Sequence, residues 1–470
     1  MSALHRKSMA ELAELLARRA ISPVALTEAL LERIEALDPH LRAFTALHVD
    51  IGLREAREAE KEIAAGRYRG PLHGIPYALK DIIDYEGVPT TANSRVLLEN
   101  VASQDAEVTR RLKQAGAVFL GKLTTNEFAC GGPAIGCPYP QPLNPWNAAA
   151  ITAGSSSGSA VALAAQLVPL ALGTDTNGSI RNPGSRCGIV GLKPTYGRVS
   201  RRGVFPLSPS LDHVGPMTRT VRDNALALAV LAGHDARDPG SRDTPVPDLL
   251  AKLDAGVEGL RIGYVRHLHA EDPGADPEQI HALDQAVESL REAGANVIEL
   301  ELGHLEQYTA VARVFLSAEG YAIHEAWLRA SPELYGKGCK GRLLQGAFLS
   351  ARDLVQAQRL RRRLIDQLVD LMSDVDVMIT ASCYDATPRV DDLAAARNRH
   401  AHQVLMPFNV TGSPALVLPT GLSRTTGLPL SMQIVGHPFD EAMVYRVARA
   451  VEIVGEDLSE RLPCSSPFEI

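Results

Sequence analysis

The hydrophobic positions of the chain recur with two different periods. Near the N-terminus, residues 22–37 (SPVALTEALLERIEAL) place apolar side chains three and four positions apart, as one face of a helix does. Ser22 is a preferred N-cap residue, and Pro23 suits the first helical position. The first 65 residues are therefore predicted to be helical.

Short apolar runs typical of buried strands come next. They include IPYALKD (75–81) and AVFLGK (117–122), with a helical pattern at 105–116 between them. Beyond residue 210, helical and strand patterns alternate: LRIGYV, EQIHALDQAVESLREAG, ANVIELEL, VDVMIT, ALVLP and LSMQIVG. This alternation predicts an α/β fold, a single large domain with a mixed, mostly buried β-sheet covered by helices on both faces.

Two loop-like stretches, 233–248 and 385–395, are candidate domain seams, although both also fit surface loops. The basic residues Arg359, Arg361, Arg362 and Arg363 lie in a helical pattern. They predict a solvated helix face rather than a binding patch.

Composition and charge exclude several classes of function. A net charge of −7 over 470 residues lacks the basic footprint of a nucleic-acid-binding protein. The N-terminus has no signal-peptide pattern, and the longest apolar run (160–173) is too short to cross a bilayer. The six cysteines form neither a C-x-x-C pair nor a disulfide framework. We therefore expect a cytoplasmic protein with free thiols and no cofactor, metal ion, nucleic-acid partner or membrane contact.

The segment AGSSSGSA (153–160) raises the first question of chemistry. It matches G-x-S-x-G with Ser156 in the centre, but the preceding NPWNAAAITA is not the apolar strand that a nucleophile elbow needs. A P-loop is also disfavoured, because no Gly-Lys-Ser/Thr triplet follows Gly158. Asp212 and His213 are adjacent and cannot easily serve as orienter and base, so His213 is predicted to be structural.

A second polar loop, TDTNGSIRNPG (174–184), changes the interpretation of the first. A helix at 159–167 would be ~14 Å long and a strand at 168–173 ~20 Å, so the chain would go out and come back. Ser155–Ser157 would then face Ser179 at one edge of the fold. Two unrelated surface turns fit the composition equally well, and these residues alone do not decide between the two.

A long set of spaced motifs resembles the amidase signature family. Residues 154–200 (GSSSGSAVALAAQLVPLALGTDTNGSIRNPGSRCGIVGLKPTYGRVS) resemble its signature region, and GPLHGIPYALKD (70–81) resembles its upstream lysine motif. SLDHVGPMTRTVRD (210–223) and NVTGSPALVLPTG with GLPLSMQIVG (409–436) resemble later landmarks. The resemblance covers essentially the whole chain and implies one amidase signature domain, 1–470. Its expected parts are an N-terminal helical segment (1–65), a signature core (70–215) and a remainder (216–470) with a helical pocket region at about 308–375.

The resemblance implies a Ser–cisSer–Lys triad, which falls on Ser179, Ser155 and Lys80. The implied reaction is hydrolysis of a C–N acyl bond of a small molecule through an acyl-enzyme, and the substrate could be an amide, aryl amide, urea or carbamate (as for a urethanase). The residue types suit this chemistry, since a serine hydroxyl needs a base to take its proton. A lysine can be that base only when neutral, and burial lowers its pKa.

The resemblance also implies an oxyanion hole, supports between the two loops and a nearby substrate pocket. The oxyanion donors would be the backbone N–H groups of Thr176, Asn177, Gly178 and Ser179. The supports would be Ser156, Asp175 and Arg181, and we place the pocket at Cys130, Gly131, Gly132 and Asn177.

Ala153, Ser157 and Asn177 stand where the family usually has glycine. Because asparagine tolerates positive φ, the oxyanion loop is expected to keep its shape. The Asn177 side chain would then lie near the scissile bond and help to select substrates.

The main alternative is the glutaminase (A) subunit of a tRNA-dependent amidotransferase, which works only inside a complex. Members of that group usually carry Tyr-Gly-Leu-type residues where this chain has RRGVFPLSPSLDH (201–213). The sequence therefore favours a small-molecule amidase, acting alone or as a homodimer. A catalytically silent binding protein is disfavoured because all three triad residues are present.

Overall fold

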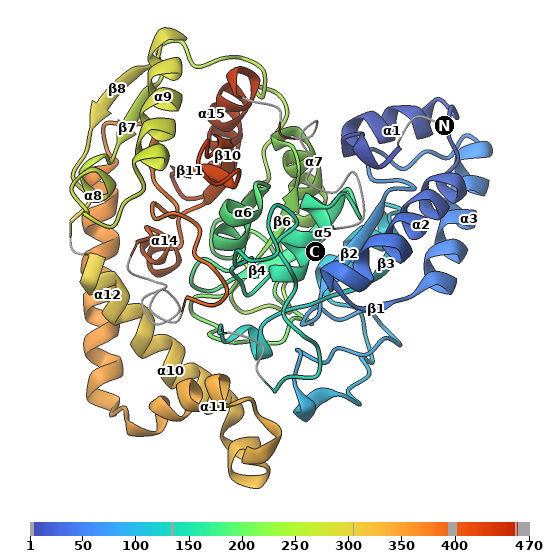
Figure 1. Ribbon diagram of the computed structural model, residues 1–470, viewed down its shortest axis with the longest axis horizontal. Helices are drawn as coiled ribbons and strands as arrows, with labels where there is room; N and C mark the ends of the chain where they lie inside the picture. The colour runs from blue at the N-terminus through green and yellow to red at the C-terminus, as the bar shows by residue number, and fades with distance from the viewer. Residues whose placement is uncertain (1–3, 133–135, 304, 393–401, 456–457, 459–470) are drawn as a thin grey trace.

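The centre of the protein is one mixed sheet of strands in the order β1-β3-β2-β4-β6-β5-β10-β11-β9-β7-β8 (Figure 1). The structure, a computed structural model, describes residues 4–132, 136–303, 305–392, 402–455 and 458. The strands are β1 (Phe44–Leu47), β2 (Pro76–Lys80), β3 (Val118–Leu123), β4 (Leu170–Asp175), β5 (Val190–Lys193), β6 (His213–Thr218), β7 (Arg261–Tyr264), β8 (Asn296–Glu299), β9 (Val377–Thr380), β10 (Ala415–Leu422) and β11 (Pro429–Gly436). The predicted α/β fold with a mixed sheet is confirmed.

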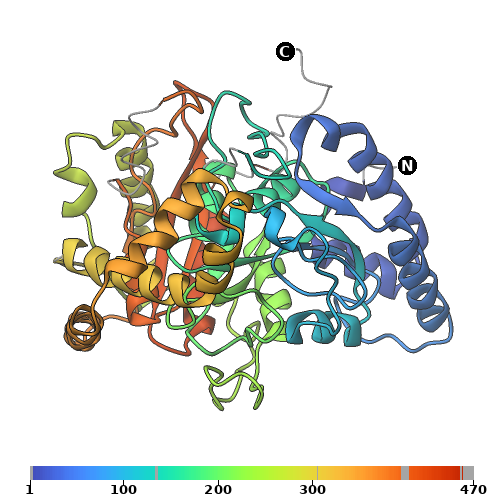
Figure 2. The same ribbon diagram turned by 90° about the horizontal axis from the view of Figure 1, so that it is seen from below.

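Helices flank this sheet. They are α1 (Met9–Ala17), α2 (Pro23–Leu41), α3 (Val49–Ala64), α4 (Glu107–Gln114), α5 (Ser157–Ala164), α6 (Arg181–Cys187), α7 (Val221–Leu231), α8 (His267–Ala270), α9 (Pro277–Glu292), α10 (Leu305–Ala330), α11 (Lys337–Leu343), α12 (Ala351–Leu371), α14 (Met406–Thr411) and α15 (Glu441–Val454). Short 3-10 turns are η1 (Leu4–Arg6), η2 (Arg95–Leu97), η3 (Glu127–Ala129), η4 (Pro332–Leu334) and η5 (Leu344–Phe348). Figures 1 and 2 show α1–α3 beside β1–β3 at one end of the molecule and α10–α12 at the other.

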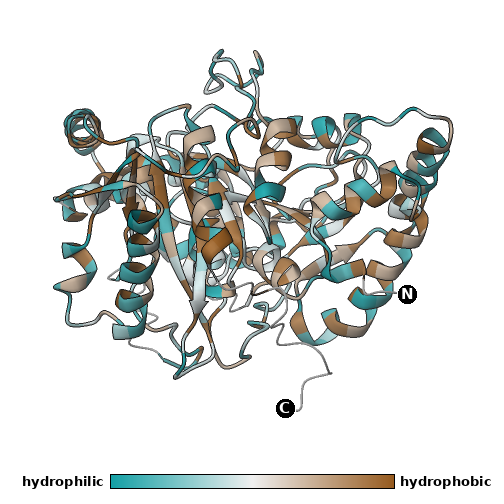
Figure 3. Ribbon diagram, turned by 90° about the horizontal axis from the view of Figure 1, so that it is seen from above, coloured by the Kyte–Doolittle hydropathy of each residue, from teal (hydrophilic) through white to brown (hydrophobic). Residues whose placement is uncertain are grey.

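The central strands are buried on both faces. Every residue of β2, β3, β4 and β11 is buried, and Figure 3 shows hydrophobic residues concentrated on the strands and hydrophilic residues on the outer helices. Strands buried in this way read as continuous apolar runs, which is why the sequence predicts them. At the N-terminus, Ser22 Oγ accepts a hydrogen bond from Ala25 N (3.0 Å) and Pro23 begins α2, as predicted.

One local prediction is wrong, and another, the solvated basic face, holds for Arg359, Arg362 and Arg363 but not for Arg361. The segment 1–65 is not wholly helical, because β1 lies within it and pairs with β3. Gly121 of β3 allows the close approach, since a Cβ there would lie 2.3 Å from Ala46 O. The basic run is not uniformly solvated either. Arg361 donates to Val410 O (2.7 Å) and Ser210 O (3.1 Å), which anchors α12.

The candidate seam at 233–248 is a loop that packs on an earlier part of the chain. Arg242 N donates to Gly197 O (3.0 Å), and Asp238 accepts from Arg201. The seam at 385–395 ends outside the described residues. None of the helices in the described ranges combines the length and apolar character that a membrane span requires.

Candidate active site

Three segments meet beyond the ends of two parallel strands. The register of β2 and β4 pairs Tyr77 with Leu170 and Leu79 with Leu172. Since parallel strands end at the same edge of a sheet, Lys80 at the end of β2 lies beside the loop that follows Asp175. Helix α5 packs against β2, β3 and β4, which brings the serines at its N-terminus to this edge. The out-and-back path predicted from the sequence is present.

Lys80 is fully buried and bonded to two hydroxyl groups. Its Nζ donates to Ser155 Oγ and to Thr174 Oγ1, each at 2.7 Å. Among the described residues it has no ion-pair partner. Burial lowers the pKa of Lys80 from its usual 10.5 to about 7, although the charges of Asp175 and Asp212 act to raise it. A large fraction of Lys80 is therefore neutral near pH 7 and able to accept a proton.

The two serine loops are bonded to each other. Ser156 N donates to Ser179 O (3.1 Å), and Ser156 Oγ bonds both the N–H and the carbonyl of Thr174 (3.2 Å each). Ser155 follows a cis peptide bond from Gly154, and its side chain is buried, whereas Ser179 is half-buried. The structure thus brings the segments of Lys80, Ser155 and Ser179 to one place.

A buried ion pair shapes the loop before Ser179. Arg181 Nε donates to Asp175 Oδ2 (2.9 Å), and its other guanidinium nitrogens bond Leu405 O and Asn409 Oδ1. Burial alone would raise the pKa of Asp175, but the charge and hydrogen bonds of Arg181 outweigh it and hold that pKa well below its usual range. The pair fixes the position of the loop from its buried side.

The backbone of the expected oxyanion loop differs from the expectation at two residues. The N–H of Gly178 donates to Asp175 Oδ1 (2.7 Å), so it is not free to bind a carbonyl oxygen in this structure. Asn177 does not adopt positive φ; that conformation belongs to Gly178 (φ 97°) and, in the other loop, to Ala153 (φ 57°). The Asn177 Oδ1 atom is buried without a hydrogen-bond partner among the described residues.

A cavity of about 480 Å³ lies next to this centre. It is lined by Thr174, which bonds Lys80, and by Thr176 and Asp212, but not by Lys80, Ser155 or Ser179. Its apolar wall includes Ala129 and Phe205, but the lining contains none of the predicted pocket residues, which are Cys130, Gly131, Gly132 and Asn177. The carbonyls of Cys130 and Gly131 accept instead from Arg342 (2.7 and 2.6 Å). A role of these residues in substrate binding stays a prediction.

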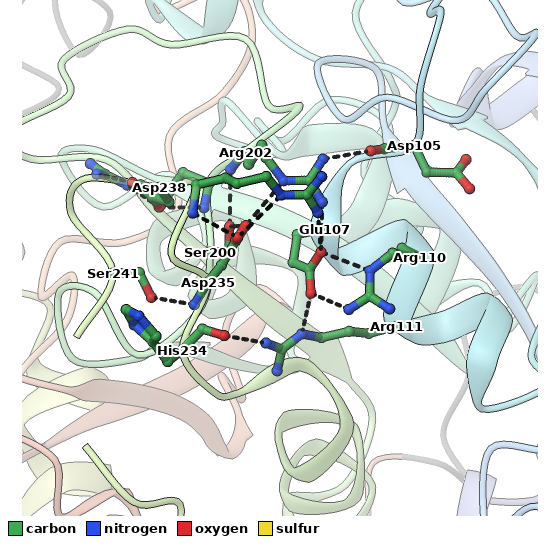
Figure 4. A network of polar contacts seen from close by, with 12 residues as sticks. Asp105, Glu107, Arg110, Arg111, Ser200, Arg202, His234, Asp235, Asp238 and Ser241 are labelled. Carbon is green, nitrogen blue, oxygen red and sulfur yellow. Dashed lines mark hydrogen bonds and ion pairs between the residues drawn. The ribbon is translucent and has the colours of Figure 1, made fainter. Parts of the chain in front are cut away.

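The rim of the cavity is braced by the ionic network of Figure 4. The Glu107 carboxylate lies between Arg110, Arg111 and Arg202, whose nearest nitrogens are 2.5–2.9 Å away, and Arg202 also bonds Asp235. Hydrogen bonds, with the largest effect from Arg110, lower the pKa of Glu107 to about 2. This network joins α4 to the loops near residues 200 and 235.

Sequence reasoning missed Thr174 and Asp212 at this site. Both lie inside family-like motifs, but nothing in their local pattern shows that Thr174 bonds Lys80 or that Asp212 bonds Thr176. Within the described part of the chain, no group of three or more His, Cys, Asp or Glu side chains is arranged to hold a metal ion.

The comparison with known proteins decides the family. The amidase family model matches residues 25–445. This chain belongs to the amidase signature family. It is an enzyme of the class that acts on C–N bonds.

Relatives and solved structures fall into two groups. The A subunit of the Glutamyl-tRNA(Gln) amidotransferase of Geotalea daltonii is 38% identical, covering 94% of this chain and 96% of the relative. Further bacterial relatives, 36–40% identical, bear the same name. The second group is structural. One chain of a vestigial protein complex, which reveals the evolutionary origins of an s-triazine catabolic enzyme, is 33% identical to this chain. The match covers 96% of this chain and 99% of the other, with a TM-score of 0.89. The peptide amidase of Stenotrophomonas maltophilia is 32% identical to this chain. The match covers 95% of this chain and 96% of the peptide amidase, with a TM-score of 0.83.

Proposed function

We propose that this enzyme hydrolyses a carboxamide C–N bond through a relay of Ser179, Ser155 and Lys80. The observation that carries the proposal is the buried Lys80 Nζ, 2.7 Å from Ser155 Oγ, with a pKa lowered by burial to about 7. A lysine without an ion-pair partner among the described residues, bonded to a serine at the end of a buried strand, has the properties of a general base.

The reaction follows from this arrangement. Ser179 Oγ attacks the carbonyl carbon while its proton passes through the Ser155 hydroxyl to Lys80 Nζ. Backbone N–H groups of Thr176, Asn177 and Ser179 would bind the developing oxyanion, and removal of one such donor typically costs about 3 kcal/mol of transition-state stabilisation. The lysine proton then returns through Ser155 to the leaving nitrogen, and the C–N bond breaks. Water hydrolyses the acyl-enzyme by the same relay.

The relatives favour one role for this reaction. Because the curated relatives described above are each named as the A subunit of an amidotransferase, we propose that the chain acts as the glutaminase component of such a complex, with protein partners. They favour this role over the carbamate-hydrolysing one that the sequence left open. The difference at 201–213, which argues against an amidotransferase component, is outweighed by similarity along 94–98% of the chain.

A stand-alone amidase acting on small amides is the second candidate. The observation in its favour is structural, since the peptide amidase superposes over nearly the whole chain with a TM-score of 0.83.

A release assay separates the two candidates. Ammonia or amine release is measured for the purified chain with L-glutamine, propionamide, acetanilide and a carbamate. Glutamine turnover that rises on addition of the other amidotransferase components supports the glutaminase role. Turnover of the other amides by the chain alone, without glutamine turnover, supports the second candidate. Ser179→Ala should abolish either activity, and a fluorophosphonate should label Ser179 rather than Ser156. Activity of Ser179→Ala equal to that of the unchanged enzyme would refute the relay.

A further inference from the structure

Asp212 lines the cavity and holds the candidate oxyanion loop. Its Oδ1 accepts a hydrogen bond from Thr176 Oγ1 (2.6 Å). Its Oδ2 accepts from the backbone N–H groups of Leu207 (2.9 Å) and Ser208 (3.0 Å). One carboxylate thus joins the loop before Ser179 to the loop before β6, and it also lines the cavity.

The position of Asp212 connects it to Lys80. Thr174 and Thr176 alternate with Asp175 at the end of β4, so their side chains point to the same side, and both line the cavity. Thr174 accepts from Lys80 Nζ, and Thr176 donates to Asp212. The two threonines therefore connect Lys80 and Asp212 to the same side of the end of β4, and the charge of Asp212 acts to raise the pKa of Lys80.

Asp212 differs from the other charges around Lys80 because nothing in the described part of the chain neutralises it directly. Asp175 is paired with Arg181, and the buried Lys122 is paired with Asp81 (3.2 Å). Asp212 faces Arg201, but that guanidinium is bound to Asp238 (2.9 Å), and no described residue forms an ion pair with Asp212. Lys193 and His213 also lie near Asp175, but burial holds the pKa of both well below its usual value, so they add little positive charge near neutral pH.

We propose that Asp212 is a positioning residue for amide hydrolysis. It holds Thr176 in the oxyanion loop, and its negative charge keeps Lys80 basic enough to take the serine proton. The inference rests on the proposed relay and adds to it the residue that sets the strength of its base.

The direction of the pH effect follows. Burial raises the pKa of Asp212 to about 6, although the hydrogen bonds from Thr176, Leu207 and Ser208 act against this, so Asp212 is ionised where Lys80 titrates, near pH 7. The ionised carboxylate favours the ammonium form and raises the pKa of Lys80. Asp212→Asn keeps an acceptor for Thr176 but removes the charge. The pKa of Lys80 should then fall, and the acid limb of activity should move to lower pH by about one unit.

The test measures the rate at which a fluorophosphonate labels Ser179 as a function of pH, because this needs no knowledge of the substrate. In Asp212→Asn the acid limb of labelling should shift downward by about one pH unit, and the plateau rate should fall as the base weakens. Asp212→Glu keeps the charge, so the acid limb of its pH profile should stay in place. Its labelling rate should fall, because the longer side chain displaces the oxyanion loop. Asp235→Asn is the matched control, since it removes a buried carboxylate that bonds Ser200 and the cavity-lining Arg202 instead of the oxyanion loop.

The outcomes separate the two proposals. If the unchanged enzyme shows no labelling of Ser179, the relay itself is wrong. If Ser179 is labelled but Asp212→Asn keeps the original limb, the relay stands and the role of Asp212 is refuted. A shift of equal size in Asp235→Asn, or in Asp212→Glu, would also refute it. The Glu variant keeps the test decisive if the Asn variant does not fold.

Discussion

Replacement of Lys80 by methionine should make the protein more stable while it destroys activity. The pKa of Lys80 is 10.5 in an unfolded chain and about 7 in the folded protein. At about 1.4 kcal/mol for each pH unit, this difference costs the folded state up to about 5 kcal/mol at pH 7 and below. Methionine has a similar length and no charge to desolvate.

The lost hydrogen bonds reduce this gain. Ser155 and Thr174 each lose one bond to Lys80 Nζ, and a typical buried bond contributes about 1 kcal/mol. Lys80→Met should therefore stabilise the protein by about 3 kcal/mol at pH 7. Because the unfolded chain binds the lysine proton more tightly, the unfolding free energy of the unchanged enzyme rises between pH 7 and 10.5, and the advantage of the variant shrinks across that window.

The assay is urea-induced unfolding at pH 7 and pH 10, followed by intrinsic fluorescence. Lys122→Met is the matched control, since Lys122 is equally buried but pairs with Asp81 and bonds Ile83 O (2.6 Å). Removal of one partner of a buried pair should destabilise the protein by about 3–5 kcal/mol. The reasoning fails if Lys80→Met is less stable than the unchanged enzyme at pH 7, or if the difference between them is the same at both pH values.

Three further predictions concern the loops around Ser179. Arg181→Met should destabilise the protein by about 3–5 kcal/mol in thermal or urea unfolding, because it leaves Asp175 buried without its partner; a change under 1 kcal/mol would contradict this. Ser155→Ala should lower turnover by about 10²–10⁴-fold, because proton transfer is lost. Ser156→Ala should instead lower the unfolding free energy by about 1–2 kcal/mol and still form the fluorophosphonate adduct on Ser179. Equal losses of turnover in the two variants would contradict the relay. Asn177→Gly should change relative rates across a panel of amides, since its buried Oδ1 has no partner among the described residues; unchanged ratios would exclude a role in selection.

The sequence predicts many, but not all, of the strands. The runs that contain β2, β3, β4 and β11 are mostly apolar, and each is a strand. It misses β5 and β6, which lie in stretches rich in glycine and proline, because their pairing with β4 and β10 overrides the low strand propensity of those residues. It misses β1 because four residues at a sheet edge, three half-buried and one exposed, carry little pattern.

Of the candidate site, the residues alone predict only that the two serine loops lie at one edge of the fold, and even that stays open against two unrelated turns. The assignment of Lys80, Ser155 and Ser179 depends on resemblance to a family, since a lysine at the end of a strand is more often an ordinary salt-bridge partner. What the sequence could not supply is the environment of Lys80. The burial that lowers its pKa comes from segments 75 and 94 positions away, those of Ser155 and Thr174.

Strand register explains why Thr174 and Asp212 escape sequence reasoning. Thr174 reaches Lys80 because β2 and β4 are aligned in parallel, and Asp212 reaches Thr176 because β4 and β6 pair Asp175 with His213. A slip of β4 by one residue would turn both threonines to the other side of the sheet and place Asp175 where they now stand. The Lys80–Thr174 and Thr176–Asp212 bonds would then be lost together. The strength of the base and the position of the oxyanion loop therefore depend on one structural variable, and a substitution that shifts β4 should affect both at once.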